Sequence, residues 1–85
     1  MRYGLEFTTS ALRELNNLDS QVRQRITTKI TGLRDDPFPS STKKLHGLPN
    51  HFRIRVGDYR IVYRVDGGRV IVVIVKIGHR KEVYR

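Results

Sequence analysis

Four arginines in the second half of the sequence have the type and spacing of a phosphate-binding surface. They fall at even spacings in segments that alternate polar with apolar residues, and they are Arg53, Arg55, Arg60 and Arg64. In extended strands such spacings place side chains on one face of a sheet. A guanidinium binds phosphate through two parallel hydrogen bonds and keeps its charge near neutral pH. A single arginine would be interpreted as a solvated side chain. Four on one face, with Arg80 following on the next strand, favour phosphate binding.

The positive charge of the chain is concentrated in the same half. Residues 1–42 carry six Lys and Arg against five Asp and Glu, a balance of +1, whereas residues 43–85 carry eleven against three, a balance of +8. So much charge favours nucleic acid, an anionic membrane or an acidic protein as the partner. Membrane-surface proteins usually carry their cations on an amphipathic helix beside Trp or Phe, but these cations fall on expected strands and the chain has no Trp. We therefore expect nucleic acid, or an acidic protein that masks the same surface.

Few residues of this half could transfer a proton. Tyr84 follows the last expected strand in a polar segment. It is either an aromatic residue at the sheet edge or a group that stacks on an RNA base and loses its proton more easily among cations. His79 lies beside Arg80, where it could transfer a proton, and His46 and His51 are interpreted as surface residues. Acidic residues are too few here for a mechanism based on paired carboxylates.

The composition excludes several classes of protein. The chain has no cysteine, so neither a disulfide framework nor a thiolate metal site can form, and no group of His, Asp or Glu has the spacing of metal ligands. The first seven residues lack the apolar run of a signal peptide. The longest apolar run, residues 70–75, is far shorter than the about 20 residues that cross a bilayer. We expect one soluble, cytoplasmic domain over residues 1–85, with one small core and without metal or cofactor.

The first half must supply the elements that cover the sheet. Residues 3–7 alternate apolar and polar side chains, which predicts a strand. Residues 8–10 offer N-caps for a first helix, and Asp19 or Ser20 caps a second one. The side chains expected to face the sheet share helical spacing: Leu12, Leu15 and Leu18 on the first helix, and Val22, Ile26, Ile30 and Leu33 on the second. Two helices with a tight joint predict a helical hairpin.

The second half must supply the sheet itself. Residues 35–41 are predicted to form a loop, and residues 43–50 look irregular. A period of two then predicts strands over 52–56 and 59–65, joined by a turn at Gly57-Asp58. After a turn at 66–68, residues 70–77 are apolar on both faces apart from Lys76, which indicates an interior strand. The sequence therefore predicts an α+β fold in the order β-α-α-β-β-β. Its antiparallel sheet has the N-terminal strand beside the last strand, the helices on one face and the arginines on the other.

Three runs of the second half form a recognisable set. They are Lys44-Leu45-His46-Gly47-Leu48-Pro49, the R-x-G-D-Y-R-I-V-Y run within residues 52–63, and Gly78-His79-Arg80 followed by Glu82-Val83-Tyr84. Together they resemble the RelE/ParE superfamily of bacterial and archaeal toxins, and the resemblance extends over essentially the whole chain. It implies a small fold like that of the microbial ribonucleases. It also implies a metal-independent endonuclease of the RelE type, an mRNA interferase that cuts messages in the ribosomal A site.

The resemblance implies roles for particular residues. The catalytic set would be Arg53, Arg55, Arg60, Arg80 and Tyr84. Contacts with RNA or the ribosome would fall to Lys43, Lys44, His46, Arg64, His79 and Lys81. In the implied reaction the ribose 2′-OH attacks its own 3′ phosphate and expels the 5′-oxygen of the next nucleotide. The sequence departs from the family pattern where two of the sheet arginines replace lysines common in relatives, and where the link from Arg80 to Tyr84 is short.

The resemblance also implies partners. They are a cognate antitoxin protein, the ribosome with mRNA in its A site, and operator DNA through the toxin–antitoxin complex only, with no membrane. Two alternatives stay open at this point. One is a ParE-like poison of DNA gyrase without nuclease activity, and the other is a nucleic-acid-binding module without catalysis.

Overall fold

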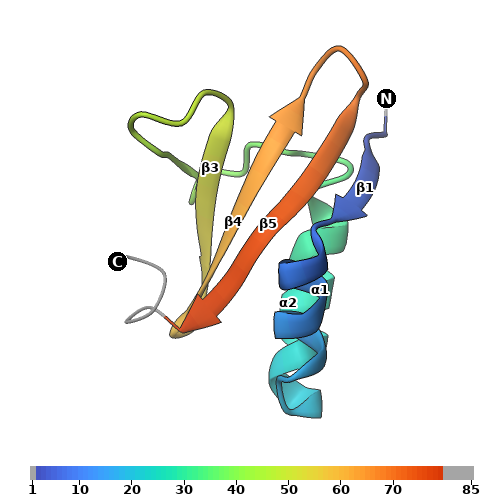
Figure 1. Ribbon diagram of the computed structural model, residues 1–85, viewed down its shortest axis with the longest axis vertical. Helices are drawn as coiled ribbons and strands as arrows, with labels where there is room; N and C mark the ends of the chain where they lie inside the picture. The colour runs from blue at the N-terminus through green and yellow to red at the C-terminus, as the bar shows by residue number, and fades with distance from the viewer. Residues whose placement is uncertain (1, 80–85) are drawn as a thin grey trace.

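Two helices and five strands make up residues 2–79, the part of the chain that the structure, a computed structural model, describes (Figure 1). In chain order they are β1 (Gly4–Phe7), α1 (Thr9–Asn16), α2 (Ser20–Gly32), β2 (Lys43–Lys44), β3 (His51–Val56), β4 (Tyr59–Asp66) and β5 (Ile71–His79). The predicted α+β order is confirmed, with one addition. The short strand β2 lies in a segment that the sequence predicted to be irregular.

Side-chain caps begin both helices where the sequence predicted them. The Thr8 hydroxyl accepts a hydrogen bond from the backbone N–H of Ala11 at 3.1 Å. The Asp19 carboxylate accepts from the backbone N–H groups of Gln21 at 3.0 Å and Val22 at 3.1 Å. Each cap satisfies backbone donors that the first turn of a helix leaves without a partner. The two caps therefore fix the residues at which α1 and α2 begin.

The buried residues of the two helices agree with the prediction for α2 but not fully for α1. On α2 the predicted stripe is confirmed, because Ile26, Ile30 and Leu33 are all almost fully buried. On α1 the prediction was wrong for Leu12, which is 46% exposed. The buried residues of α1 are Ala11 and Leu15, which lie four residues apart on one face, whereas Leu12 lies one residue further around the helix.

The five strands form one sheet in the order β1-β5-β4-β3-β2. The predicted placement of β1 beside β5 is confirmed, but β1 runs parallel to β5, whereas every other pair is antiparallel. In a meander the first and third strands, β3 and β5, run in the same direction, so β1 and β3 start at the same end of the sheet. β5 begins at Ile71, one residue later than predicted, because Val70 has a left-handed φ of 58°.

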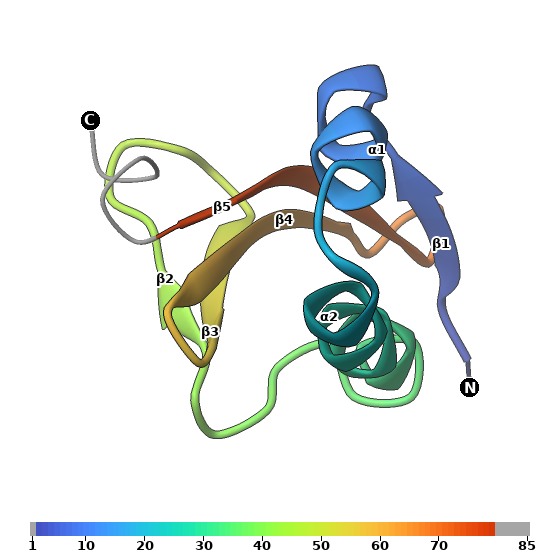
Figure 2. The same ribbon diagram turned by 90° about the horizontal axis from the view of Figure 1, so that it is seen from below.

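The helices lie together on one face of the sheet, and the core fills the space between them (Figure 2). Its buried members are Ala11, Leu15, Ile26, Ile30, Leu33, Ile54, Ile61, Tyr63, Val65, Val72, Ile74 and Ile77. Tyr63 also fixes the loop between α2 and β2. Its hydroxyl donates to the carbonyl of Pro37 at 2.7 Å and lies 3.1 Å from the Thr42 hydroxyl. Burial raises the pKa of this phenol. No helix within residues 2–79 is long and apolar enough to cross a membrane.

Candidate phosphate-binding face

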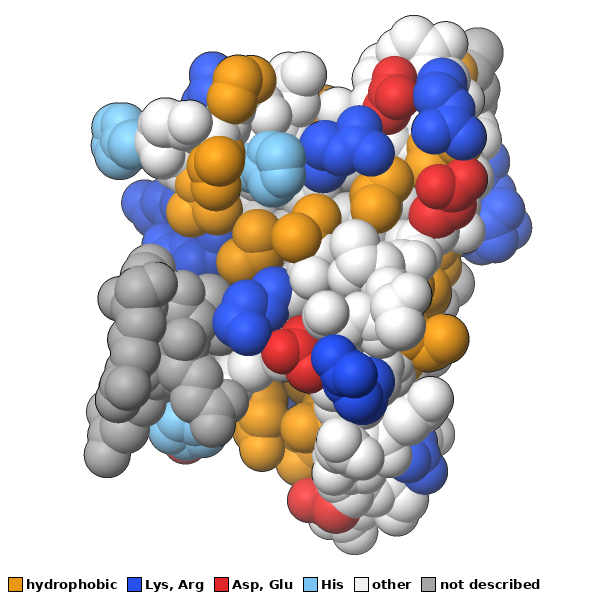
Figure 3. Space-filling model, viewed as in Figure 1, with side chains coloured by type: hydrophobic (Ala, Val, Ile, Leu, Met, Phe, Trp, Pro, Cys, Tyr) orange, Lys and Arg blue, Asp and Glu red, His pale blue; other side chains and the backbone are white. Residues whose placement is uncertain are grey.

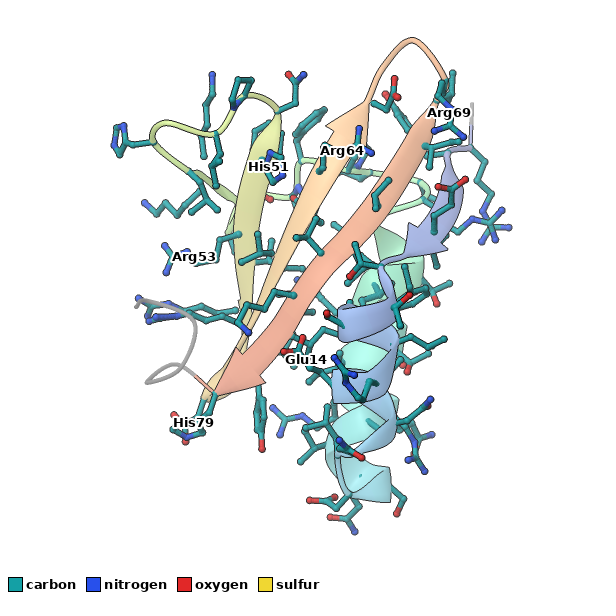
Figure 4. All side chains as sticks on the ribbon, viewed as in Figure 1. Glu14, His51, Arg53, Arg64, Arg69 and His79 are labelled. Carbon is teal, nitrogen blue, oxygen red and sulfur yellow. The ribbon has the colours of Figure 1, made fainter. Side chains whose placement is uncertain are left out.

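The four sheet arginines share the face that points away from the helices. Arg55 pairs directly with Arg60 across β3 and β4, Arg53 pairs with Val62, and Arg64 pairs with His51. Directly paired residues of neighbouring strands point to the same side of a sheet, and so do residues two apart on one strand. The prediction that these arginines share one face is therefore confirmed. We call this surface, which carries Arg53, Arg55, Arg60 and Arg64, the arginine face. Figure 4 labels two of its residues, Arg53 and Arg64.

Two of these arginines are buried in the protein. Arg60 is 7% exposed and Arg53 is 9% exposed, whereas Arg55 is exposed and Arg64 is partly exposed. A guanidinium does not give up its charge when it is buried, so burial is costly unless the surroundings stabilise the cation. The alternative of simple solvated side chains therefore does not describe Arg53 and Arg60. It still fits Arg55 and Arg64.

The position opposite Arg60 on β5 has no side chain. Arg60 lies between Arg55 on β3 and Gly78 on β5, with which it pairs directly. An opposing residue would otherwise stand about 5 Å away on the same face. Gly78 therefore contributes no side chain beside Arg60, and it is itself buried.

The end of the face near the β4–β5 turn is less strongly charged. Arg64 lies 3.8 Å from the Asp66 carboxylate, a long ion pair with both side chains partly exposed. His51 is the direct neighbour of Arg64 in the sheet, and its Nδ1 lies 2.8 Å from the carbonyl of Pro49. Because a carbonyl can only accept, Nδ1 carries the proton in this contact. Exposed pairs of this kind contribute little to stability, so Arg64 can exchange Asp66 for another anion.

The structure separates the other residues singled out in the sequence. Lys43 pairs with Arg53 and so lies on the arginine face, whereas Lys44 pairs with Phe52 on the other side. His46 is exposed in the loop after β2. His79 pairs with Tyr59, and their rings meet edge to face with centroids 5.6 Å apart. Because Tyr59 alternates with Arg60, His79 points away from the arginine face. Arg80, Lys81 and Tyr84 lie outside the described residues.

Sequence reasoning missed one ion pair beside the face. The Nζ of Lys76 on β5 lies 3.0 Å from Oε2 of Glu14 on α1, and Oε1 of Glu14 accepts from the backbone N–H of Ile77 at 2.9 Å. A lone lysine in an otherwise apolar strand was the available signal. Its partner could not be found from sequence, because Glu14 is 62 residues away along the chain.

The arginine face can therefore bind and neutralise a phosphate, but it has little means of moving protons. Arginine does not act as a base at neutral pH, since its pKa is above about 12. Among residues 2–79 no group of three or more His, Cys, Asp or Glu is placed to hold a metal ion. The chemistry that this face can supply is electrostatic, namely a set of fixed positive charges around a phosphodiester.

A hollow of about 720 Å³ lies on the helix side, between α2 and the β3–β4 turn. Arg25, Lys29 and Arg55 contribute positive charge to its lining against the carboxylate of Asp36, and the rest includes apolar surface from Leu33 and Val56. Since Arg55 also belongs to the arginine face, the hollow and the face meet at the end of β3. A partner bound in the hollow would be in reach of a residue of the face.

Comparison with known proteins gives the chain relatives along its whole length. The family model for the ParE toxin of the type II toxin–antitoxin system parDE matches residues 5–84. The mRNA interferase toxin RelE of Escherichia coli K12 is 34% identical over 88 residues, covering 99% of this chain and 92% of that protein. Toxin RelG of Mycobacterium tuberculosis is 33% identical over 86 residues, covering 100% and 99%.

A solved structure agrees with these sequence relatives. A chain of the toxin–antitoxin complex RelBE2 from Mycobacterium tuberculosis superimposes with a TM-score of 0.82 at 32% identity. The match covers 94% of this chain and 100% of that one. The sheet, the two helices and the arginine-bearing strands thus coincide with a known fold and with sequences similar over their full length. The chain belongs to the RelE/ParE superfamily, the toxins of type II toxin–antitoxin systems.

Proposed function

We propose that this toxin is a ribosome-dependent mRNA endonuclease of the RelE type. The observation that carries the proposal is the arginine face, where the strand register brings four arginines together and two of them are buried. Four guanidinium groups on one face of a sheet form a concentrated positive surface, which favours a polyanion as the ligand. The relative named mRNA interferase toxin RelE supports RNA as the source of that anion.

The proposed reaction is an internal transesterification. The 2′-oxygen of a ribose forms a bond to the adjacent phosphorus as the bond to the 5′-oxygen of the next nucleotide breaks. The 2′ proton leaves, and a proton is delivered to the departing 5′-oxygen. Arg60, on the middle strand of the sheet, would neutralise the charge that develops on the phosphate, with help from Arg53 or Arg55. Tyr84 or a nearby group would take the 2′ proton, and Arg80 would stabilise the departing 5′-oxygen until it takes up a proton.

Weak proton transfer explains the dependence on the ribosome. The proposed groups have reference pKa values of about 10 for tyrosine and above about 12 for arginine, so neither is a good base at neutral pH. Most of the rate must then come from alignment of the 2′-oxygen with the scissile bond and from electrostatic stabilisation. A ribosome that holds a codon in an attack geometry supplies the alignment that this small face lacks. The proposed enzyme therefore acts in the cytoplasm and is weak on free RNA.

The proposal includes a cognate antitoxin as the second partner. The RelBE2 structure is, by its name, a complex of a toxin with its antitoxin. The hollow beside α2 combines apolar surface with the charges of Arg25, Lys29 and Arg55, so an acidic segment with apolar side chains fits it by charge and polarity. Such a segment would also occupy Arg55 of the arginine face. Operator DNA would be bound only through this complex.

A ParE-like activity is the second candidate, because the matching family model is that of ParE toxins. A gyrase poison acts by binding a protein and cuts no RNA itself. Its activity would not require the positive charge of Arg60, whereas that of the proposed nuclease would. Loss of Arg60 therefore separates the two candidates.

The test is primer-extension mapping of an mRNA on purified ribosomes, with wild-type protein, Arg60→Ala and the control Arg69→Ala. Arg69, labelled in Figure 4, is an exposed arginine in the β4–β5 turn, whereas Arg60 lies at the other end of β4. We expect cuts within A-site codons with the wild type and with the control, none with Arg60→Ala, and little cleavage of free RNA. An mRNA that the wild-type protein leaves intact on ribosomes would contradict the proposal. Inhibition of gyrase supercoiling by the wild-type protein would then support the second candidate.

A further inference from the structure

The outer edge of β5 is covered by two different means. β1 pairs with β5 only as far as Ile74, opposite Phe7, and β5 continues to His79. Beyond Ile74 the edge of β5 is covered by α1 and its N-cap residue. The Thr8 hydroxyl donates to the carbonyl of Val75 at 3.1 Å, and Glu14 accepts the N–H of Ile77. Glu14 thus substitutes for a missing strand, and this backbone contact fixes the position of its carboxylate.

The same carboxylate holds Lys76 beside the arginine face. In Figure 3 an acidic side chain lies between two basic ones in the region where Figure 4 labels Glu14. The Lys76 side chain is 43% exposed and that of Glu14 is 27% exposed. An ammonium has three N–H donors, and within residues 2–79 Lys76 uses one of them, for Glu14. Two donors remain to be shared with another anion.

The register places Lys76 at the end of a row that crosses four strands. Lys43 on β2 pairs with Arg53 on β3, Arg53 pairs with Val62 on β4, and Val62 pairs with Lys76 on β5. With strands about 4.8 Å apart, this row is about 14 Å long from its first to its last Cα atom. Three of its four side chains are cations. The row therefore forms a basic track across the sheet, perpendicular to the strands.

Lys76 also lies near Arg60 on the same face of the sheet, at a different position along β5. Arg60 pairs with Gly78, two residues further along β5, so Lys76 is its diagonal neighbour across the strand pair. Diagonal neighbours lie about 7–8 Å apart, which long side chains can span. At that separation two cations can contact successive phosphates of one strand, with Arg60 at one and Lys76 at the next.

We propose that Lys76 is a phosphate-binding residue of the toxin, which holds the RNA phosphate next to the scissile one and extends the basic track to the edge of β5. This inference rests on the proposed nuclease function, because it takes RNA as the ligand. The ammonium is already held by Glu14 in the free protein, so its side-chain entropy is not lost again on binding. Its role is binding rather than chemistry, since it acts on a neighbouring phosphate.

The experiment compares Lys76→Met with Arg69→Met. Arg69 in the β4–β5 turn forms an exposed ion pair with Glu6 at 3.4 Å, so each variant removes the positive charge of one ion pair. Each is titrated with a short single-stranded RNA in which every ribose is 2′-O-methylated, so that it binds but cannot be cut. For single strands, log K falls with log salt by about 0.7 for each phosphate contact. We expect Lys76→Met to bind roughly fivefold more weakly and to lower this slope by about 0.7, with Lys76→Arg restoring both.

The outcomes separate this inference from the proposed function. On ribosomes, Lys76→Met should raise KM for A-site cleavage with kcat unchanged, whereas Arg60→Ala abolishes cleavage. Suppose that the wild type cuts mRNA on ribosomes and that both variants bind the RNA with the same dependence of log K on log salt as the wild type. Lys76 is then only a structural link to α1, and the inference is overturned. If the wild type neither binds the RNA nor cuts on ribosomes, the inference and the proposed function both fail. Thermal unfolding of each variant confirms that it is folded before titration.

Discussion

Removal of one buried hydroxyl should loosen the loop that leads into the arginine face. In Tyr63→Phe the ring remains in the core, but the hydrogen bond to the Pro37 carbonyl and the contact with Thr42 are lost. A net hydrogen bond contributes about 1 kcal/mol, and a buried acceptor left without a donor costs about 1–3 kcal/mol. Because Pro37 is buried, we expect a loss of about 2 kcal/mol in the free energy of unfolding. For a domain of this size that corresponds to about 8–16 °C in Tm.

The assay is urea unfolding at pH 7 of the wild type, Tyr63→Phe and the control Tyr59→Phe. The phenol of Tyr59 is only partly buried and makes no hydrogen bond within residues 2–79, so its loss should cost little. A loss below about 0.5 kcal/mol in Tyr63→Phe, equal to that of the control, would refute the reasoning, because surface-like substitutions already fall within that range.

The same hydroxyl predicts a dependence on pH. Its pKa is raised by burial in the folded protein, whereas in the unfolded chain it has the ordinary value of about 10. The folded state therefore holds this proton more tightly, so its contribution is complete below pH 10 and is lost as the pH rises above 10 toward the raised folded value. The difference in stability between wild type and Tyr63→Phe should narrow in that range. If the difference in stability widened above pH 10, the predicted direction of the Tyr63 pKa shift would be wrong.

Two further substitutions test the local structure around the site. Asp19→Ala removes the cap of α2 and should cost about 1 kcal/mol in urea unfolding, whereas Asp19→Asn, which keeps an acceptor oxygen, should cost much less. Gly57→Ala places a Cβ at a left-handed φ of 58° and 3.2 Å from Nη2 of Arg25, so we expect a loss of about 1–2 kcal/mol by the same measurement. If Gly57→Ala were neutral, the β3–β4 turn would be adopting another conformation.

Local patterns predicted the helices, the hairpin and the shared face of the arginines. Caps depend on one side chain and the next few backbone groups, so Asp19 was recognisable as one of two candidates. The period of two along β3 and β4 was sufficient to put Arg55 and Arg60 on one side. These features depend on neighbours in the sequence, which is why a single chain was enough to find them.

Features that depend on distant segments were not predicted in the same way. The burial of Arg60 and the parallel direction of β1 depend on how the elements pack, and the contact of Lys76 with Glu14 joins a strand to a helix from the other end of the chain. His79 illustrates a different limit. It was grouped with Arg80 because the two are adjacent in sequence, yet the β-strand alternation directs it to the side of Tyr59.

The pairing of β1 with β5 also affects when the protein can fold during synthesis. β1 is the first element to leave the ribosome and β5 is the last of those described, and Gly4 must find Ile71 across 67 residues of chain. Closing so long a loop is slow, and β5 forms the interior of the sheet between β1 and β4. A nascent chain that has not reached β5 therefore has no finished sheet. The sheet that carries the arginine face is completed only after translation has passed β5.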